Sequence, residues 1–248
     1  MTAPIPRDIP DLPAITRPPR LLPSPVPARA VLTPVRRVPA AVFRLLTALL
    51  ALTGAALELT LGPPLRALSH FTVQSSVLLA LVMLASARRA WSARHPLSGG
   101  VTGAALLYAI VAGLVHHLLL ANASSPFAVA DAAGSGRHAV AVQIMCTAAP
   151  VAAVLDWLLL TGTGRLHLRQ TAGWLLYPLG YLGFSLARGE LLIPGTEDRY
   201  LYPFLDVDQH GYRGVLGNAL LLGLALLALA TLLVALDHVR PDPLRRRW

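Results

Sequence analysis

The residues of this chain that could do chemistry are hydroxyl, imidazole and thiol side chains set into strongly apolar runs. Thr72, Gln74, Ser75 and Ser76 lie in the stretch HFTVQSS, directly before the apolar run VLLALVMLA. A threonine or serine hydroxyl becomes a nucleophile when a base such as histidine lies in hydrogen-bond reach and a donor stabilises the oxyanion. The sequence therefore offers the parts of a hydrolase site with a threonine or serine nucleophile, and Thr72 with a histidine from the third or fourth apolar run would fit.

A second chemistry open to these side chains is metal binding. The ligands would come from three histidines and two glutamates, namely His116, His117, His138, Glu58 and Glu190. Their spacing matches no zinc signature. The sequence also has no phosphate-binding glycine loop, no dinucleotide-binding turn, no HExxH and no GxSxG. We therefore predict neither a metal nor a cofactor.

The elements that must position these side chains are helices in a membrane. Of the 248 residues, 55% are apolar and 13% are charged, whereas a soluble domain carries about 25% charged residues. Six runs approach the ~20 apolar residues that a bilayer span needs. They cover 40–62, 71–87, 101–121, 139–160, 171–187 and 215–236. We predict an all-α bundle of six transmembrane helices over residues 40–239.

Two tails flank the predicted bundle. Residues 1–39 hold 11 of the 21 prolines, and such a segment buries too little apolar surface to order itself. We expect a disordered cytoplasmic tail there, with no signal peptide, because no apolar run follows the first residues. Residues 240–248, which end in RRRW, are predicted to be a basic cytoplasmic tail.

The distribution of arginine predicts the orientation in the membrane. All 21 basic residues are arginine, and with the N-terminus in the cytoplasm 16 fall on the cytoplasmic side and five outside. This excess predicts that both termini are cytoplasmic. Attraction to anionic lipids accounts for the basic tails, so we expect membrane lipids as partners and no nucleic acid.

This orientation puts most polar side chains of the spans in the outer half of the bilayer. A polar group in hydrocarbon costs several kcal/mol unless it is paired, so these groups should face the bundle or a wet cavity. We predict an outer-leaflet polar cavity. Its lining is Glu58, Thr72, Gln74, Ser75, Ser76, His116, His117, His138, Gln143, Cys146, Tyr177, Tyr181, Ser185, Arg188 and Asn218. For Ser75 and Ser76 an alternative stays open, in which the hydroxyl bonds to the preceding turn of its own helix.

Aromatic and charged residues near the span ends are expected to be anchors. Tyr200, Tyr202, Phe204 and Tyr212 are typical of an interfacial aromatic belt on the outer side. The pair Asp156–Trp157 is expected to anchor the cytoplasmic end of the fourth span.

The order of four motifs resembles a known membrane family. FTVQSS is followed by PVAAVLDWLL, then by WLLYPLGYLGFSLARGE, and finally by YPFLD. Together they resemble an actinobacterial branch of the family of androgen-induced and androgen-dependent TFPI-regulating membrane proteins. The resemblance covers roughly residues 40–240 and implies six helices with both termini inside. It also implies a threonine hydrolase for fatty-acid esters of hydroxy fatty acids, with Thr72 at the position of the nucleophile.

The position of the family's histidine is a departure from the pattern. It falls on Cys146, four residues before Pro150. A thiol with an ordinary pKa of about 8.5 does not exchange protons near pH 7 as imidazole does. His138, two turns earlier, or a histidine of the third span could replace it. We expect weak hydrolysis of a lipid-like ester by a site containing Thr72, Cys146 and His138.

Two other functions stay open on the sequence alone. One is a protein without catalysis that binds or transports a lipid or a small ligand. The other is a scaffold whose polar core only sets how the helices pack.

Overall fold

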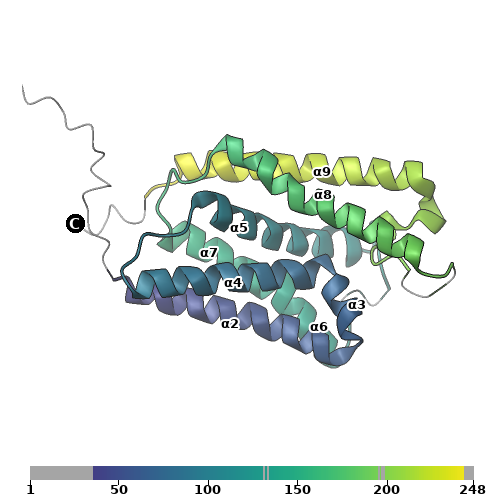
Figure 1. Cartoon of the computed structure of the whole chain (residues 1–248), viewed down its shortest axis with the longest axis horizontal. Helices are drawn as coiled ribbons and strands as arrows, with labels where there is room; N and C mark the ends of the chain where they lie inside the picture. Colours follow the sequence, from purple (N-terminus) through teal and green to yellow (C-terminus); the bar gives the residue numbers. More distant parts are fainter. Residues whose placement is uncertain (1–35, 131, 133, 195, 197–198, 243–248) are drawn as a thin grey trace, which may run out of the picture. The chain divides into compact units, whose positions relative to one another are not determined.

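The computed structural model describes residues 36–242, except 131, 133, 195, 197 and 198. The predicted N-terminal tail up to residue 35 and the end of the C-terminal tail, 243–248, lie outside the described residues. Within the described part all regular secondary structure is helical, which confirms the all-α prediction (Figure 1). The elements are α2 (Val38–Leu61), α3 (Pro64–Ser69), α4 (Phe71–Trp91), α5 (Gly99–Leu114), the π-helix η1 (Val115–Leu120), α6 (Gly136–Gln143), the π-helix η2 (Ile144–Ala148), α7 (Ala149–Leu160), α8 (Leu168–Leu191), the 3-10 helix η3 (Pro203–Leu205) and α9 (Val207–Val239).

Five helical stretches in the described part are long and apolar enough to cross a membrane. They are Val38–Leu61, Phe71–Trp91, Gly99–Leu120, Gly136–Leu160 and Val207–Val239. The length and composition of these helices therefore support the prediction of a polytopic membrane protein. The remaining predicted span, 171–187, lies inside α8, which has the length of a span but is less apolar because it carries tyrosines, glycines and Pro178.

Proline and a side-chain cap set two of the helix boundaries. Gly62 follows the last residue of α2 in an extended conformation, and the Pro63–Pro64 pair then begins α3. Proline favours the first turn of a helix because its missing N–H would have no partner there. At the start of α9 the Asp206 carboxylate accepts hydrogen bonds from the N–H groups of Asp208 and Gln209, as an N-cap does.

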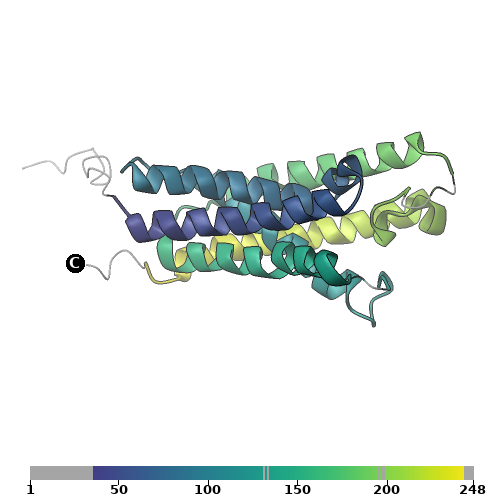
Figure 2. The same ribbon diagram turned by 90° about the horizontal axis from the view of Figure 1, so that it is seen from below.

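The long helices alternate in direction, so their ends gather at two ends of the bundle (Figures 1 and 2). Arg36 Nε donates to the carbonyl of Trp91 at 2.9 Å, and Arg37 Nη2 donates to the carbonyl of Leu160 at 2.8 Å. Arg240, just beyond α9, also donates to carbonyls at the end of α7. The start of α2 and the ends of α4, α7 and α9 therefore lie at one end, which we call the proximal end. The opposite end is the distal end.

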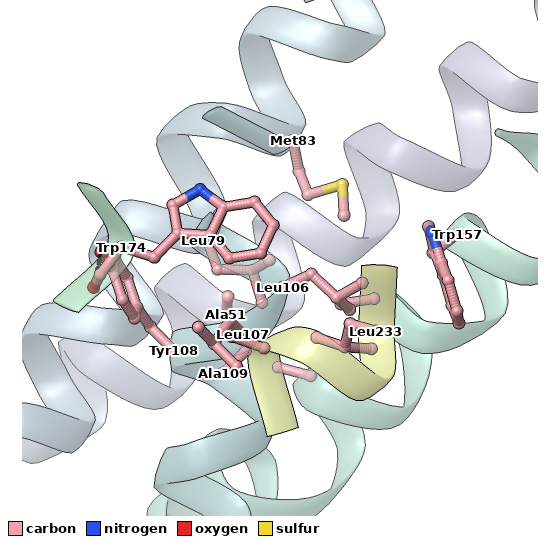
Figure 3. Packing of buried hydrophobic residues seen from close by; sticks show 14 of the residues in the cluster. Ala51, Leu79, Met83, Leu106, Leu107, Tyr108, Ala109, Trp157, Trp174 and Leu233 are labelled. Atoms are coloured by element: carbon pink, nitrogen blue, oxygen red, sulfur yellow. Dashed lines mark hydrogen bonds between the residues drawn. The ribbon is translucent and has the colours of Figure 1, made fainter. Parts of the chain in front are cut away.

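The core is made by residues from α2, α4, α5, α7, α8 and α9 (Figure 3). Its largest fully buried side chains include Leu79 and Leu107. Small residues bring the helices close: a Cβ on Gly54 would lie 2.7 Å from Met145 Cγ, and one on Gly113 would lie 2.5 Å from the carbonyl oxygen of Cys146. The core thus depends on close backbone approach as well as on apolar burial.

A buried ion pair joins α2 to α7 at the proximal end. Arg44 Nε lies 2.8 Å from Asp156 Oδ1, and the two side chains are 8% and 7% exposed. Thr161 Oγ1 donates to the second oxygen of Asp156 at 3.1 Å and accepts from Arg44 Nη2 at 3.2 Å. The expected anchor residue Asp156 is therefore part of an internal hydrogen-bond network.

The carboxylate of Asp237 holds a second network at the same end. Asp237 is completely buried, and its Oδ2 accepts from the backbone N–H groups of Arg165 at 2.7 Å and Leu166 at 3.0 Å. Its Oδ1 accepts from Trp157 Nε1 at 3.2 Å and from Arg240 Nη2 at 2.9 Å. Arg240, placed in the C-terminal tail by the sequence analysis, thus packs into the bundle and ties α9 to α7.

Removing one member of the Arg44–Asp156 pair should destabilise the protein strongly. Arg44→Leu or Asp156→Leu leaves an unpaired buried charge, so the free energy of unfolding should fall by about 3–5 kcal/mol. The double variant should lose less than either single variant, because it buries no charge. Unfolding of the purified protein in detergent measures this, with the exposed Arg88→Leu as control. Equal stability of Arg44→Leu and Arg88→Leu would contradict the structural role of the pair.

Candidate functional site

Two π-helical turns carry three of the predicted site residues, His116, His117 and Cys146. The turn η1 contains His116 and His117, and η2 contains Cys146 and Thr147. A π-turn changes the helical period and is frequent at functional sites. Cys146 is 4% exposed, whereas Gln143 is exposed and hydrogen-bonded to Thr147, so Cys146 does not share the face of these two residues.

A cavity of about 610 Å³ lies among the start of α4, the α5–η1 stretch, α8, the segment before α9, and α9. Its wall is mostly hydrocarbon, supplied largely by leucines of η1, α8 and α9. The polar side chains in its lining are Thr72, His116, Tyr181 and Tyr202. Its size lies in the usual range for ligand pockets, about 300–1,000 Å³. The site is thus a mostly apolar cavity with a few polar groups, rather than a cavity that is polar throughout.

The hydroxyl of Tyr202 lies against the first turn of α4. Burial raises the pKa of Tyr202 to about 12. Hydrogen bonds that its oxygen accepts from the Thr72 side chain and from the N–H groups of Thr72 and Phe71 offset part of this rise. The first N–H groups of a helix have no partner within the helix, so a buried oxygen is well placed there. At neutral pH the phenol therefore keeps its proton and remains a hydrogen-bond donor beside Thr72.

His116 and His117 point in different directions, as neighbouring positions on a helix require. His116 is 5% exposed and lines the cavity. His117 is exposed, and its Nε2 lies 2.8 Å from Thr147 Oγ1, which in turn donates to Gln143 Oε1 at 3.1 Å. Because the Thr147 hydroxyl donates to Gln143, we assign the proton in the first contact to His117 Nε2. The two rings touch edge to face with centroids 4.9 Å apart.

The structure does not bring His138 and Cys146 into the wall of the cavity that Thr72 lines. His138 Nδ1 lies 3.0 Å from Glu58 Oε2, a contact that joins α6 to the end of α2. Cys146 packs in a cluster with buried residues of α2 and α4, among them Ala55 and Val73. Within the described residues, no three histidine, cysteine or acidic side chains come together as metal ligands.

Several other predicted cavity residues are hydrogen-bonded to their neighbours. Gln74 Nε2 donates to the carbonyl of Leu68 at 2.8 Å, and its Oε1 accepts from the hydroxyl of Tyr177 at 2.8 Å. Ser75 Oγ donates to the carbonyl of Thr72 at 3.0 Å. For Ser75 the alternative of a bond to its own helix is therefore the one observed.

The remaining members of the predicted set lie at the distal end outside the cavity wall. Asn218 Nδ2 donates to a carbonyl of η3 at 3.1 Å, and Arg188 Nη1 donates to the carbonyl of Arg199 at 3.0 Å. Ser76 is buried. Ser185 is buried too, and its hydroxyl has no hydrogen-bond partner within the described part of the chain.

The burial of Tyr202 beside Thr72 was not predicted from the sequence. This residue was expected at the membrane interface, but it is 5% exposed and its ring stacks on that of Phe204. The loop that carries it is held by Arg199, whose Nη1 lies 2.6 Å from Asp208 Oδ1 and whose Nη2 lies 3.8 Å from Glu190 Oε1. The motif YPFLD drew attention to this segment in the sequence, but it did not indicate that Tyr202 is buried.

Comparison of the chain with models of protein families, with curated proteins and with solved structures found no match.

The burial of Cys146 should protect it from thiol reagents. It is the one cysteine of the chain, so labelling with a maleimide reports on this position alone. Because only an accessible thiolate reacts, labelling of the native protein should be roughly tenfold or more slower than labelling after denaturation. The control is Ser92→Cys in a Cys146→Ala background, which should react quickly in the native state. Equal native rates for the two proteins would show that Cys146 is accessible.

Proposed function

We propose that this protein is a multi-pass membrane protein that binds a lipid-like ester in the cavity beside Thr72 and hydrolyses it slowly. The observation that supports this most directly is that Thr72 and His116 both line one mostly apolar cavity. An acyl chain suits a wall of leucine side chains, while a few polar groups suffice to orient an ester. The five apolar helices provide the membrane setting in which such a ligand is found.

The proposed reaction uses a threonine nucleophile and an imidazole base. Thr72 Oγ attacks the ester carbonyl carbon while His116 takes its proton and then passes it to the leaving alcohol. Water, deprotonated by the same imidazole, then releases the acid from Thr72. Tyr202 would donate to the oxyanion, and its position beside Thr72 supports this role.

The resemblance of the sequence to the androgen-induced and androgen-dependent TFPI-regulating membrane proteins supports the choice of nucleophile. In that resemblance Thr72 occupies the nucleophile position, and Cys146 occupies the position of the histidine. Since Cys146 does not line the cavity, we assign the base to His116 instead.

A second candidate function is binding or transport of the same class of ligand without turnover. One observation favours it. Within the described residues, Thr72 Oγ makes no hydrogen bond to a histidine, a cysteine or a carboxylate, and the side chain that it contacts by a hydrogen bond is that of Tyr202. A nucleophile needs a base in hydrogen-bond reach. In this alternative, the hydroxyl groups only orient the ligand.

We further propose that α8 is a sixth span, and that both termini lie on the cytoplasmic side of a bacterial plasma membrane. Two observations support this. Sixteen of the 21 arginines then fall on the cytoplasmic side, and Arg37 and Arg240 both contact the end of α7. The proximal end would then be cytoplasmic, and the cavity would lie toward the outer leaflet.

Hydrolysis is tested with the purified protein in detergent and a long-chain nitrophenyl ester. Thr72→Ala should abolish turnover and Thr72→Ser should retain part of it. His116→Gln should lower the rate by about 10²-fold or more, the usual contribution of a general base. The control is His210→Gln, a histidine outside the cavity wall, which should leave the rate unchanged. Equal rates for the parent and Thr72→Ala would refute the hydrolase, while saturable binding without turnover would favour the second candidate.

The membrane topology is tested with single cysteines in a Cys146→Ala background. Ser92→Cys and Thr163→Cys, in proximal loops, should react with a membrane-impermeant maleimide only from the cytoplasmic side. Ser124→Cys and Thr196→Cys, in distal loops, should react only from outside, because α8 separates Thr163 from Thr196 and an even number of spans returns the chain to the cytoplasm. Labelling of Thr163→Cys and Thr196→Cys from the same side would show that α8 does not cross.

A further inference from the structure

We infer that the cavity selects amphiphiles whose inserted polar group is uncharged, such as neutral esters and long-chain alcohols, and discriminates against fatty-acid anions and phosphate-bearing lipids. This inference rests on the proposed function, because it concerns the ligand class of the same cavity. Neither the threonine chemistry nor the membrane setting requires such selectivity for uncharged head groups.

The first observation is the chemistry of the cavity wall. Among the described lining residues none is arginine, aspartate or glutamate, and the chain contains no lysine. The polar groups of the wall are three hydroxyls, those of Thr72, Tyr181 and Tyr202, and the imidazole of His116. These groups offer hydrogen bonds to a carbonyl or a hydroxyl group but no permanent opposite charge to an anion.

The second observation is that several charged side chains at the distal end are paired with one another outside the cavity wall. Glu58 is paired with His138 at 3.0 Å. Arg199 is paired with Asp208 at 2.6 Å and lies 3.8 Å from Glu190. These paired groups lie outside the cavity wall, so none of them supplies a counter-charge to an anionic headgroup inside it.

The energetic consequence follows from burial. Moving an ionised carboxylate or phosphate into an apolar site is far more costly than moving an ester or a hydroxyl group, unless a counter-charge lies there. The cavity of about 610 Å³ is walled mainly by leucines, so it supplies none. A neutral head group loses much less on entry because the hydroxyls replace its hydrogen bonds to water.

The hydroxyl groups are also arranged to bind a neutral head group. Tyr181 donates its proton to the carbonyl of Ser69 at 3.0 Å, so it has no proton left to offer an anion. Tyr202 remains a donor at neutral pH, because burial raises its pKa to about 12. An alcohol oxygen or an ester carbonyl can accept from Tyr202.

The test compares ligands that share one hydrocarbon chain and differ only in the head group. Radiolabelled oleyl alcohol is bound to the purified protein in nanodiscs of a zwitterionic phospholipid, and unlabelled oleyl alcohol, oleate or oleyl phosphate is added as competitor. The assay is run at about pH 9, well above the pKa of a carboxyl group. We expect oleate and oleyl phosphate to compete roughly tenfold or more weakly than oleyl alcohol, because an unpaired charge in the cavity costs more than the ~1.4 kcal/mol of a tenfold change.

Two variants connect the selectivity to this cavity. Leu118→Arg puts a cation at its wall and should improve competition by oleate relative to oleyl alcohol. Leu191→Arg adds the same charge at an exposed position outside the wall and should leave the ratio unchanged. Competition by oleate and oleyl phosphate as strong as that by oleyl alcohol would overturn the selectivity and leave the binding proposal standing. Absence of saturable binding of oleyl alcohol would overturn both.

Discussion

A charge buried in an apolar bundle must be paired, and the proximal ends of the helices are arranged by this requirement. Asp237 is completely buried and collects backbone and side-chain donors from the loop before α8, from α7 and from the residue just after α9. The Arg44–Asp156 ion pair joins α2 to α7 at the same end. Leaving any of these groups without its partner costs several kcal/mol in a low-dielectric interior. The networks therefore specify which helix ends meet and hold one end of the bundle together.

The distal end is built differently. Here π-turns interrupt two helical stretches, and a cavity remains between the start of α4, η1, α8 and α9. The π-turn η1 buries His116 in the cavity wall while His117 stays exposed and contacts Thr147. The lipid site that we propose lies at this end, where the cavity wall is mostly hydrocarbon.

Some of the structure could be predicted from particular residues. The hydrophobic runs predicted the five apolar helices, and the second run was expected to begin at Phe71, where α4 begins. Thr72 and His116 were both selected as site residues, and both line the cavity. Gln143 and Cys146 were both expected to line the polar cavity, but neither lies in its wall. The π-turn η2 changes the helical period between them, and no local composition predicts such a turn. Tyr202 was assigned to the interface, because a tyrosine after a span is typical there.

The sequence by itself determined the helical class, the apolar helices and the asymmetry of arginine. These depend on local hydrophobicity and on summed charge, which are properties of short segments. Only the tertiary structure decided that Tyr202 lies against Thr72, that Cys146 and His138 lie outside the cavity wall, and that Arg240 reaches Asp237 and the end of α7. Such contacts join helices that are far apart in the chain. Their geometry follows from how small residues such as Gly54 and Gly113 let the backbones approach, which no single segment encodes.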